Sequence, residues 1–318
     1  MKSKIKKSYY RLDFQIVICI IVIAATLFSF LSLAITVINS LKSNDEIITN
    51  IFALPKASLL GENIAFNFSH AWEAVKTSFI SSIILSLIGA FFNCLLGSVL
   101  AYVFAYKDFY FKEFFFMMFL SVMLLPSIMG MPVLVPFVKN TLHLGETYIG
   151  YLLPNFAGGQ VGALFLFRTF FCQQPKSIYE SAQIEGANDF HIYLQIAIPL
   201  SWAIILFHFV GVFGSYYNDY LWPSLILGNK MTLMPKMLSQ QETFNSLREK
   251  GSMYAMCMIS CIPLIITSTI SMKYLFYGKE KIIRSYRRIR QQGTGLRRLF
   301  ASVSRRVRRG GCNRPERI

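Results

Sequence analysis

Six long apolar runs alternate with short charged segments along the chain. They cover approximately residues 14–38, 79–104, 114–137, 148–170, 193–213 and 253–274. Runs of about 20 apolar residues match the thickness of the hydrocarbon core of a bilayer. Backbone polar groups at that depth must be satisfied within the segment itself, which a helix achieves. The pattern therefore predicts an all-α fold, a polytopic bundle of about six transmembrane helices.

The composition supports the same class. Charged residues make up 15% of the 318 residues, and hydrophobic residues make up 54%. A soluble domain of this length would carry roughly a quarter charged residues. The charges that are present fall between the apolar runs, which excludes an amphipathic, water-soluble core.

The distribution of basic residues predicts the orientation. Five of them precede the first run, which is too long for the apolar region of a signal peptide and is expected to remain as an anchor. With the N-terminus in the cytoplasm, Lys107, Lys112, Arg168 and Lys176 all fall on the cytoplasmic side, as the positive-inside rule requires. The basic residues of segment 230–250 fall outside, in a longer loop where charge counts for less. Both termini are predicted to be cytoplasmic.

A basic tail, residues 279–318, follows the last run and holds roughly half of all basic residues. Such a block of like charge is typical of a disordered tail, and its basic residues would lie near anionic lipid headgroups. No nucleic-acid-binding module accompanies it, so membrane lipids are the expected partner and nucleic acid is not.

Segment 175–200, between the fourth and fifth runs, has strong local signals. Pro175 suits the first turn of a helix, and Ser177 with Glu180 fits a capping box. Gly186 would end that helix, and Asn188 would cap the next one. The expected structure is a short exposed helix, a glycine bend and a return to the membrane.

This segment resembles the EAA loop of ATP-binding-cassette (ABC) importer permeases, E-A-A-x-x-x-G followed by I-x-L-P. The matching residues are Glu180, Ser181, Ala182 and Gly186, then Ile196, Ile198 and Pro199. Glu185, Gly186 and Ala187 also resemble the D-G-A of the carbohydrate importers. Serine replaces the second alanine, and isoleucine replaces the usual leucine. We call residues 175–200 the EAA-like segment.

Three further stretches extend the resemblance over residues 12 to 278. They are Asn39-Ser40-Leu41-Lys42, Ala101-Tyr102, and Tyr217-Asn218-Asp219-Tyr220-Leu221-Trp222-Pro223. Similar motifs, N-S-L-K, A-Y and W-N-D-Y-L-W-P, occur in sugar permeases, in particular in the maltose importer's G subunit. The resemblance implies one permease domain, residues 1–278, with the MetI-like fold in a bacterial cytoplasmic membrane.

The resemblance also implies partners. A second permease subunit, a dimer of ABC ATPases and an extracytoplasmic binding protein would complete the importer. In such an importer the helix of this loop docks in a groove on the ATPase. Glu180 would pair with a group in that groove, Ala182 would allow the helix to approach it closely, and the bend at Gly186 would direct the helix toward it. The chain has no G-x-x-x-x-G-K-[ST] phosphate loop, so ATP and Mg²⁺ are expected on the ATPase. No metal cluster or catalytic constellation is apparent, and no enzymatic activity or cofactor is expected of this chain.

The solute pathway is predicted from polar and irregular positions near the membrane. Asn93 lies within the second run, and Asn218 and Asp219 lie at the outer end of the fifth. An intramembrane polar group is a candidate for a pathway, although helix packing explains each equally well. His208 is expected to hydrogen-bond a neighbouring helix, and Trp222 is expected in an interfacial belt.

Prolines interrupt the third run at positions 126, 132 and 136. Irregular backbone at membrane depth usually lines a cavity or is buried in protein. This run, which also contains Gly130, is therefore a candidate to border the pathway, and helix packing explains it equally well.

Other functions remain open on the sequence alone. A permease for a non-sugar solute is the nearest alternative. A secondary transporter would need intramembrane acids and an internal repeat, and the apolar runs contain essentially no carboxylates. A membrane anchor that recruits nucleic acid through its tail is a third possibility.

Overall fold

The computed structural model describes the backbone of residues 12–292 and the side chains of residues 16–273. These residues form helices, and no strand occurs among them, which confirms the all-α prediction. They divide into two compact units. The first unit joins the chain up to Lys76 with Met237–Ile262, and the second joins Thr77–Lys236 with the chain from Pro263 onward.

The first unit holds the N-terminal helices and parts of three longer ones. Its elements are α1 (Leu12–Ser40), α2 (Asn44–Thr49), a 3₁₀ turn (Ala57–Leu59), the start of α3 (Leu60–Tyr106), most of α13 (Leu233–Ser246) and the start of α14 (Lys250–Gln292). On α1 every side chain from Ile16 to Ala34 is exposed. A helix that is apolar all round and uncovered by protein is what lipid contact requires.

A buried polar corner connects these elements, and we call it the N-S-L-K corner (Asn39–Lys42 with Asn50, Ile51 and Asn67). The Lys42 side chain is fully buried. Its ammonium donates to Asn39 Oδ1 at 3.1 Å and to the carbonyls of Asn50 and Ile51 at 3.2 and 3.1 Å. The amide of Asn67 donates to the Ser40 and Lys42 carbonyls at 3.0 and 2.9 Å. The lysine and asparagine of this motif therefore tie the end of α1 to α2 and α3.

The second unit contains nine helices of its own among the described residues, besides the later parts of α3 and α14. They are α4 (Lys112–Val122), α5 (Met131–Pro136), α6 (Tyr148–Gly158), α7 (Gln160–Cys172), α8 (Lys176–Ile184), α9 (Asp189–Ile192), α10 (Ile198–Leu200), α11 (Trp202–Asn218) and α12 (Leu221–Ile226). A 3₁₀ turn covers Ser127–Gly130, and π-helical segments cover Phe137–Thr141 and Tyr193–Ala197. Helix α7 packs on α4, α6 and α11.

Three helical stretches are long and apolar enough to cross a membrane by themselves: Ile16–Ser40, Ala57–Tyr106 and Lys250–Lys273. Three bent pairs satisfy the same test together: Lys112–Val122 with Ser127–Thr141, Tyr148–Gly158 with Gln160–Cys172, and Asp189–Leu200 with Trp202–Asn218, bent by 90°, 41° and 78°. Counting each pair as one span gives the six that the apolar runs predict. Pro126 lies in the break of the first pair and Pro199 just before that of the third, where proline removes a backbone donor, whereas the second pair breaks at Gly159.

Two helices are longer than their apolar runs. Helix α3 starts at Leu60 and includes the charged residues Glu62, Glu73 and Lys76 before the run begins. Helix α14 continues to Gln292, where the sequence predicted a disordered tail from Lys279. Isoleucine and tyrosine recur at helical spacing among its arginines, and arginine is a good helix former. The tail from residue 293 onward lies outside the described residues.

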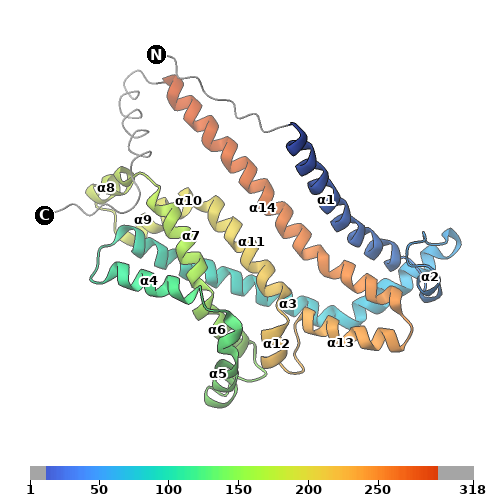
Figure 1. Cartoon of the computed structure of the whole chain (residues 1–318). Coiled ribbons are helices and arrows are strands. Elements are labelled where there is room, and N and C mark those ends of the chain that lie inside the picture. The colour runs from blue at the N-terminus through green and yellow to red at the C-terminus, as the bar shows by residue number, and fades with distance from the viewer. Residues whose placement is uncertain (1–11, 293–318) are drawn as a thin grey trace. The chain divides into compact units, whose positions relative to one another are not determined.

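The core of the second unit consists of two clusters, one toward each end of α11. One cluster gathers Tyr102, Phe167, Phe171, Tyr179 and Ile205, among others. The other gathers Leu85, Tyr151, Tyr216 and Trp222, among others. Gly97 lets α3 approach α7 closely, since a Cβ there would lie 2.3 Å from the Cβ of Ala163. Figure 1 shows α8 beside the upper end of α7 and α5 below α6.

Candidate functional site

The EAA-like segment folds as two short helices joined by a tight bend. Helix α8 is followed by a turn, then by α9, the π-helical segment Tyr193–Ala197 and α10. On α8 only Tyr179 is buried, while Glu180, Ser181 and Ile184 are exposed. Helix α8 therefore has one buried aromatic side chain and presents most of its other side chains outward.

Gly186 supplies the bend, as the sequence predicted. Its φ is +85°, a left-handed conformation that glycine adopts at low cost. The Gly186 N–H donates to the Gln183 carbonyl, and the Ala187 N–H donates to the Ala182 carbonyl, both at 3.0 Å. This pair of bonds is a Schellman motif, which satisfies the last carbonyls of α8. Ala182 and Ala187 pack against the same core cluster as Tyr179.

The two predicted helix caps have different outcomes. The Asn188 cap is confirmed, because its Oδ1 accepts the His191 N–H at 2.8 Å. The capping box of Ser177 and Glu180 is wrong. Helix α8 begins at Lys176 with Pro175 as its N-cap residue, and no side chain caps it. Ser177 thus lies inside the first turn, where its carbonyl accepts the Ser181 hydroxyl at 2.8 Å.

The remaining predicted residues of this segment lie around its bend and its return. Ala182, Glu185, Gly186 and Ala187 line a small cavity of 470 Å³ together with Asn188 and His191. Ile198 is half-buried and Pro199 is exposed in α10. The next residue but one, Ser201, is fully buried at the 78° bend between α10 and α11.

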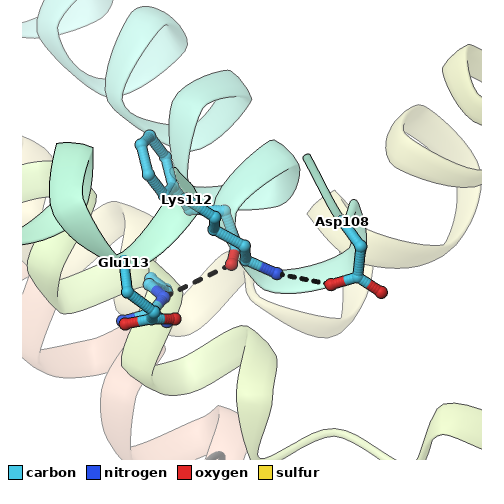
Figure 2. Close-up of polar contacts among 5 residues, drawn as sticks. Asp108, Lys112 and Glu113 are labelled. Carbon is cyan, nitrogen blue, oxygen red and sulfur yellow. Dashed lines mark hydrogen bonds and ion pairs between the residues drawn. The ribbon is translucent and has the colours of Figure 1, made fainter. Parts of the chain in front are cut away.

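Charged residues at the α3–α4 junction fix the neighbouring loop. Figure 2 shows the Lys112 ammonium directed at the Asp108 carboxylate, 3.2 Å away. Arg168 on α7 donates to Glu113 at 3.0 Å and lies over the ring of Phe116. Lys107 pairs at 2.5 Å with Asp189, the first residue of α9. The basic residues used to predict orientation thus also connect α3, α4, α7 and α9.

The three predicted pathway residues line one cavity. A hollow of 1040 Å³ is bordered by α3, α6, α11, α12 and the broken third span. Asn93, Asn218 and Asp219 all border it. So do Pro126 and Gly130, where the third span is interrupted. The irregular backbone predicted to border a pathway therefore does line a cavity.

Asn93 lies on the inner wall and is almost completely buried. Its Oδ1 lies 3.1 Å from His208 Nε2 on α11. The expectation that His208 bonds a neighbouring helix is confirmed, and its partner is one of the predicted residues. Sequence spacing gave no indication of this pairing, because the two residues are far apart in the chain.

Asn218 and Asp219 lie at the end of α11. Asn218 is exposed and donates to the Gly214 carbonyl at 2.9 Å. The Asp219 carboxylate accepts the N–H groups of Leu221 and Trp222 at 3.1 and 3.4 Å. Burial raises the pKa of the Asp219 carboxyl, and these two backbone bonds oppose that rise. Asp219 thus helps to start α12 while it borders the cavity.

The sequence suggested that Trp222 lies in an interfacial belt, and the structure shows that this prediction is wrong. Its side chain is buried, and its indole N–H donates to the Tyr151 carbonyl at 3.1 Å. A buried indole needs such a partner. The ring therefore supports the cavity wall.

The chain has similar relatives and a similar solved structure. A profile of the family "Binding-protein-dependent transport system inner membrane component" matches residues 93–278. The sn-glycerol-3-phosphate permease UgpE of Yersinia pestis is 26% identical over 72% of this chain and 84% of its own length. The arabinooligosaccharide permease AraQ of Bacillus subtilis is 27% identical over 76% and 85%.

The diacetylchitobiose permease NgcG of Streptomyces coelicolor is 25% identical over 72% of this chain and 75% of its own length. The fold is also that of a chain in a bacterial ABC transporter that imports the acidic polysaccharide alginate. That match has a TM-score of 0.68 and 21% identity, and it covers 84% of this chain and 99% of that one. With its apolar helices, the chain is a multi-pass membrane protein that belongs to the family of binding-protein-dependent transport system inner membrane components.

Proposed function

We propose that this chain is one of two permease subunits of an ABC importer that translocates a sugar or a related polyol. The named relatives carry glycerol-3-phosphate, diacetylchitobiose and arabinooligosaccharides, all of which present at least two hydroxyl groups. An extracytoplasmic binding protein would deliver the solute. A dimer of ATPases on separate chains would bind ATP and Mg²⁺ and supply the driving force.

The observation that carries the proposal is the two-sided structure of the EAA-like segment. Tyr179 is buried in the core, while Glu180 and Ile184 on the same short helix are exposed. An exposed apolar side chain beside an exposed carboxylate suits a docking surface, in which the apolar residue anchors and the charge orients. With both termini in the cytoplasm, this surface faces the ATPase.

The residues that line the cavity of 1040 Å³ form the proposed wall of the solute pathway in this subunit. Asn93, Asn218 and Asp219 offer amide and carboxylate groups to it. Amides both donate and accept hydrogen bonds, and carboxylates accept them, which matches the hydroxyl groups of a sugar. The second permease subunit would supply the opposite wall.

Affinity purification of the tagged chain in mild detergent tests the proposal. The native chain should recover a second multi-spanning protein and an ATPase. Glu180→Lys should keep the membrane partner and lose the ATPase by about tenfold or more, since reversing a charge within a contact costs more than removing it.

Glu242→Lys is the matched control. Glu242 is an exposed glutamate on α13, away from the EAA-like segment in sequence, and its reversal should leave ATPase recovery unchanged. Recovery of this chain alone, from native and variant membranes alike, would contradict the proposal and favour a self-sufficient transporter.

A further inference from the structure

The side chain of Gln174 connects the EAA-like segment to the bend before α11. Gln174 follows the end of α7, and its Nε2 donates to the Ser201 hydroxyl at 2.8 Å. Its Oε1 accepts the hydroxyl of Tyr179 from α8. The Tyr106 hydroxyl at the end of α3 donates to the Phe171 carbonyl at 2.9 Å and lies 3.4 Å from the same Oε1. One amide thus contacts three separate elements.

Tyr179 is held in the same place by its ring. It stacks on Tyr106 with the ring centroids 4.1 Å apart. Burial raises the pKa of the Tyr179 hydroxyl, so the group stays protonated and remains a donor at neutral pH. Helix α8 is therefore attached by a stacked ring and a directed hydrogen bond.

Ser201 is the residue at which the fifth span changes direction. It is fully buried and separates helices that meet at 78°. The backbone on its N-terminal side is irregular, with the π-helical segment Tyr193–Ala197 followed by Pro199. Proline and π-helical segments are places where helices bend. The Ser201 hydroxyl accepts the hydrogen bond from the Gln174 amide, 2.8 Å away.

Helix α11 leads from this bend to the cavity. Its 17 residues correspond to about 25 Å at 1.5 Å per residue. Ser201 lies at its start, His208 bonds Asn93 midway, and Tyr216 and Asn218 border the cavity at its end. A rotation at Ser201 is therefore transmitted along a helix to the groups that border the cavity.

We infer that Gln174 is a positioning residue that transmits displacement of α8 to the α10–α11 bend, and through α11 to the cavity. The inference rests on the proposed coupling of the EAA-like segment to an ATPase. Apolar contacts of α8, such as those of Ala182, can slide, because they have no preferred direction. A satisfied buried polar network keeps one geometry, because an unpaired group there is costly.

Cysteine accessibility in the cavity tests the inference without knowledge of the solute. Ser215→Cys places a reporter at an exposed serine that borders the cavity, in a chain whose six native cysteines are replaced by serine or alanine. The complex is purified with its ATPase and labelled with a maleimide, before and after trapping with ATP and vanadate. With Gln174 intact, trapping should change the labelling rate by about fivefold or more, the lower range of measured couplings between sites.

Gln174→Leu should reduce that change to less than about twofold while ATPase recovery stays normal. Gln173→Leu is the matched control, since Gln173 is the exposed neighbour of the half-buried Gln174, and it should behave as the parent chain does. Ser201→Ala should match Gln174→Leu, and combining the two should cause no further loss, as expected for one shared interaction. Gln174→Glu keeps the acceptor for Tyr179 and can accept the Ser201 hydroxyl, so it should restore most of the change.

The outcomes separate the inference from the proposed function. A full change of labelling in Gln174→Leu would overturn the transmission role and leave the coupling proposal standing. Loss of the ATPase from Gln174→Leu would overturn it as well, because the residue would then act in docking. No change in the parent chain, with the ATPase bound, would overturn the coupling proposal and the inference together.

Discussion

Two motifs shared with sugar permeases have opposite physical characters in this chain. In the N-S-L-K corner the charged side chain of Lys42 is fully buried, and its ammonium has three acceptors. In the EAA-like segment the charged side chain of Glu180 is exposed. Each motif combines charged residues with small or polar neighbours, and the sequence alone does not show which charge is buried.

The difference shows what each motif is for. A buried ammonium is tolerated only when its donors are satisfied. The hydrogen bonds of the corner therefore serve to stabilise the fold. An exposed carboxylate on a short helix adds little to folding stability. Its occurrence in the EAA-like motif therefore indicates contact with a partner protein. The three predictions that follow separate stability from docking, beginning with the largest effect.

Lys42→Met should destabilise the protein by about 3 kcal/mol, because it leaves the Asn39 side chain and two backbone carbonyls without their donor in a buried site. Thermal unfolding in detergent, followed by size-exclusion chromatography, measures the loss. Lys76→Met is the control, since Lys76 is half-exposed in a pair with Glu73 and should change stability by less than about 0.5 kcal/mol. Equal melting temperatures for Lys42→Met and Lys76→Met would show that the N-S-L-K corner does not stabilise the fold, which would contradict the comparison between the two motifs.

Ile184→Asp should lower ATPase recovery by about tenfold, equivalent to about 1.4 kcal/mol, and leave thermal stability unchanged. The side chain is 87% exposed on the EAA-like segment, so folding does not depend on it, whereas a docked partner would bury it. Ile48→Asp is the matched control, because Ile48 is an exposed isoleucine beside the N-S-L-K corner. If the two variants recover the same amount of ATPase, Ile184 is not part of the docking surface.

The parts of the fold that follow from local chemistry could be predicted from the sequence. Apolar runs predicted the spans, Gly186 predicted the end of α8, and Asn188 predicted the start of α9. The false capping box around Ser177 shows the limit of such patterns, because α8 begins at Lys176, with Pro175 just before its first turn rather than in it. Spacing alone could not show which of two competing start signals prevails.

Contacts between distant segments could not be predicted in the same way. Pro199 indicated a disturbance in the fifth span, but the bend falls at Ser201, where a buried hydroxyl bonds Gln174. Gln174 had no signal, since a glutamine between a helix and a proline is ordinary loop composition. Asn93 and His208 were each noticed as polar residues in apolar runs, and only the fold brings them within 3.1 Å. Such pairs depend on how helices cross, which periodicity does not specify.

Glu46 provides the smallest expected effect and extends the comparison to pH. Its carboxylate accepts the Ser43 N–H at 3.0 Å and the Lys56 N–H at 3.1 Å, within a capping box at the start of α2. Burial works to raise the pKa of Glu46, but these hydrogen bonds and the nearby charge of Lys56 outweigh it, and the net shift is downward. A carboxyl with a lowered folded pKa stabilises the protein above its unfolded pKa, and that stability is lost as the pH falls through the folded value.

The native chain should therefore exceed Glu46→Gln in melting temperature at pH 7, by an amount equivalent to about 1 kcal/mol or less, and the gap should close below about pH 4.5. Glu180→Gln should leave the melting temperature at pH 7 unchanged, because its side chain is exposed. A pH-independent difference for Glu46→Gln would mean that the shape of this side chain, rather than its charge, stabilises the start of α2.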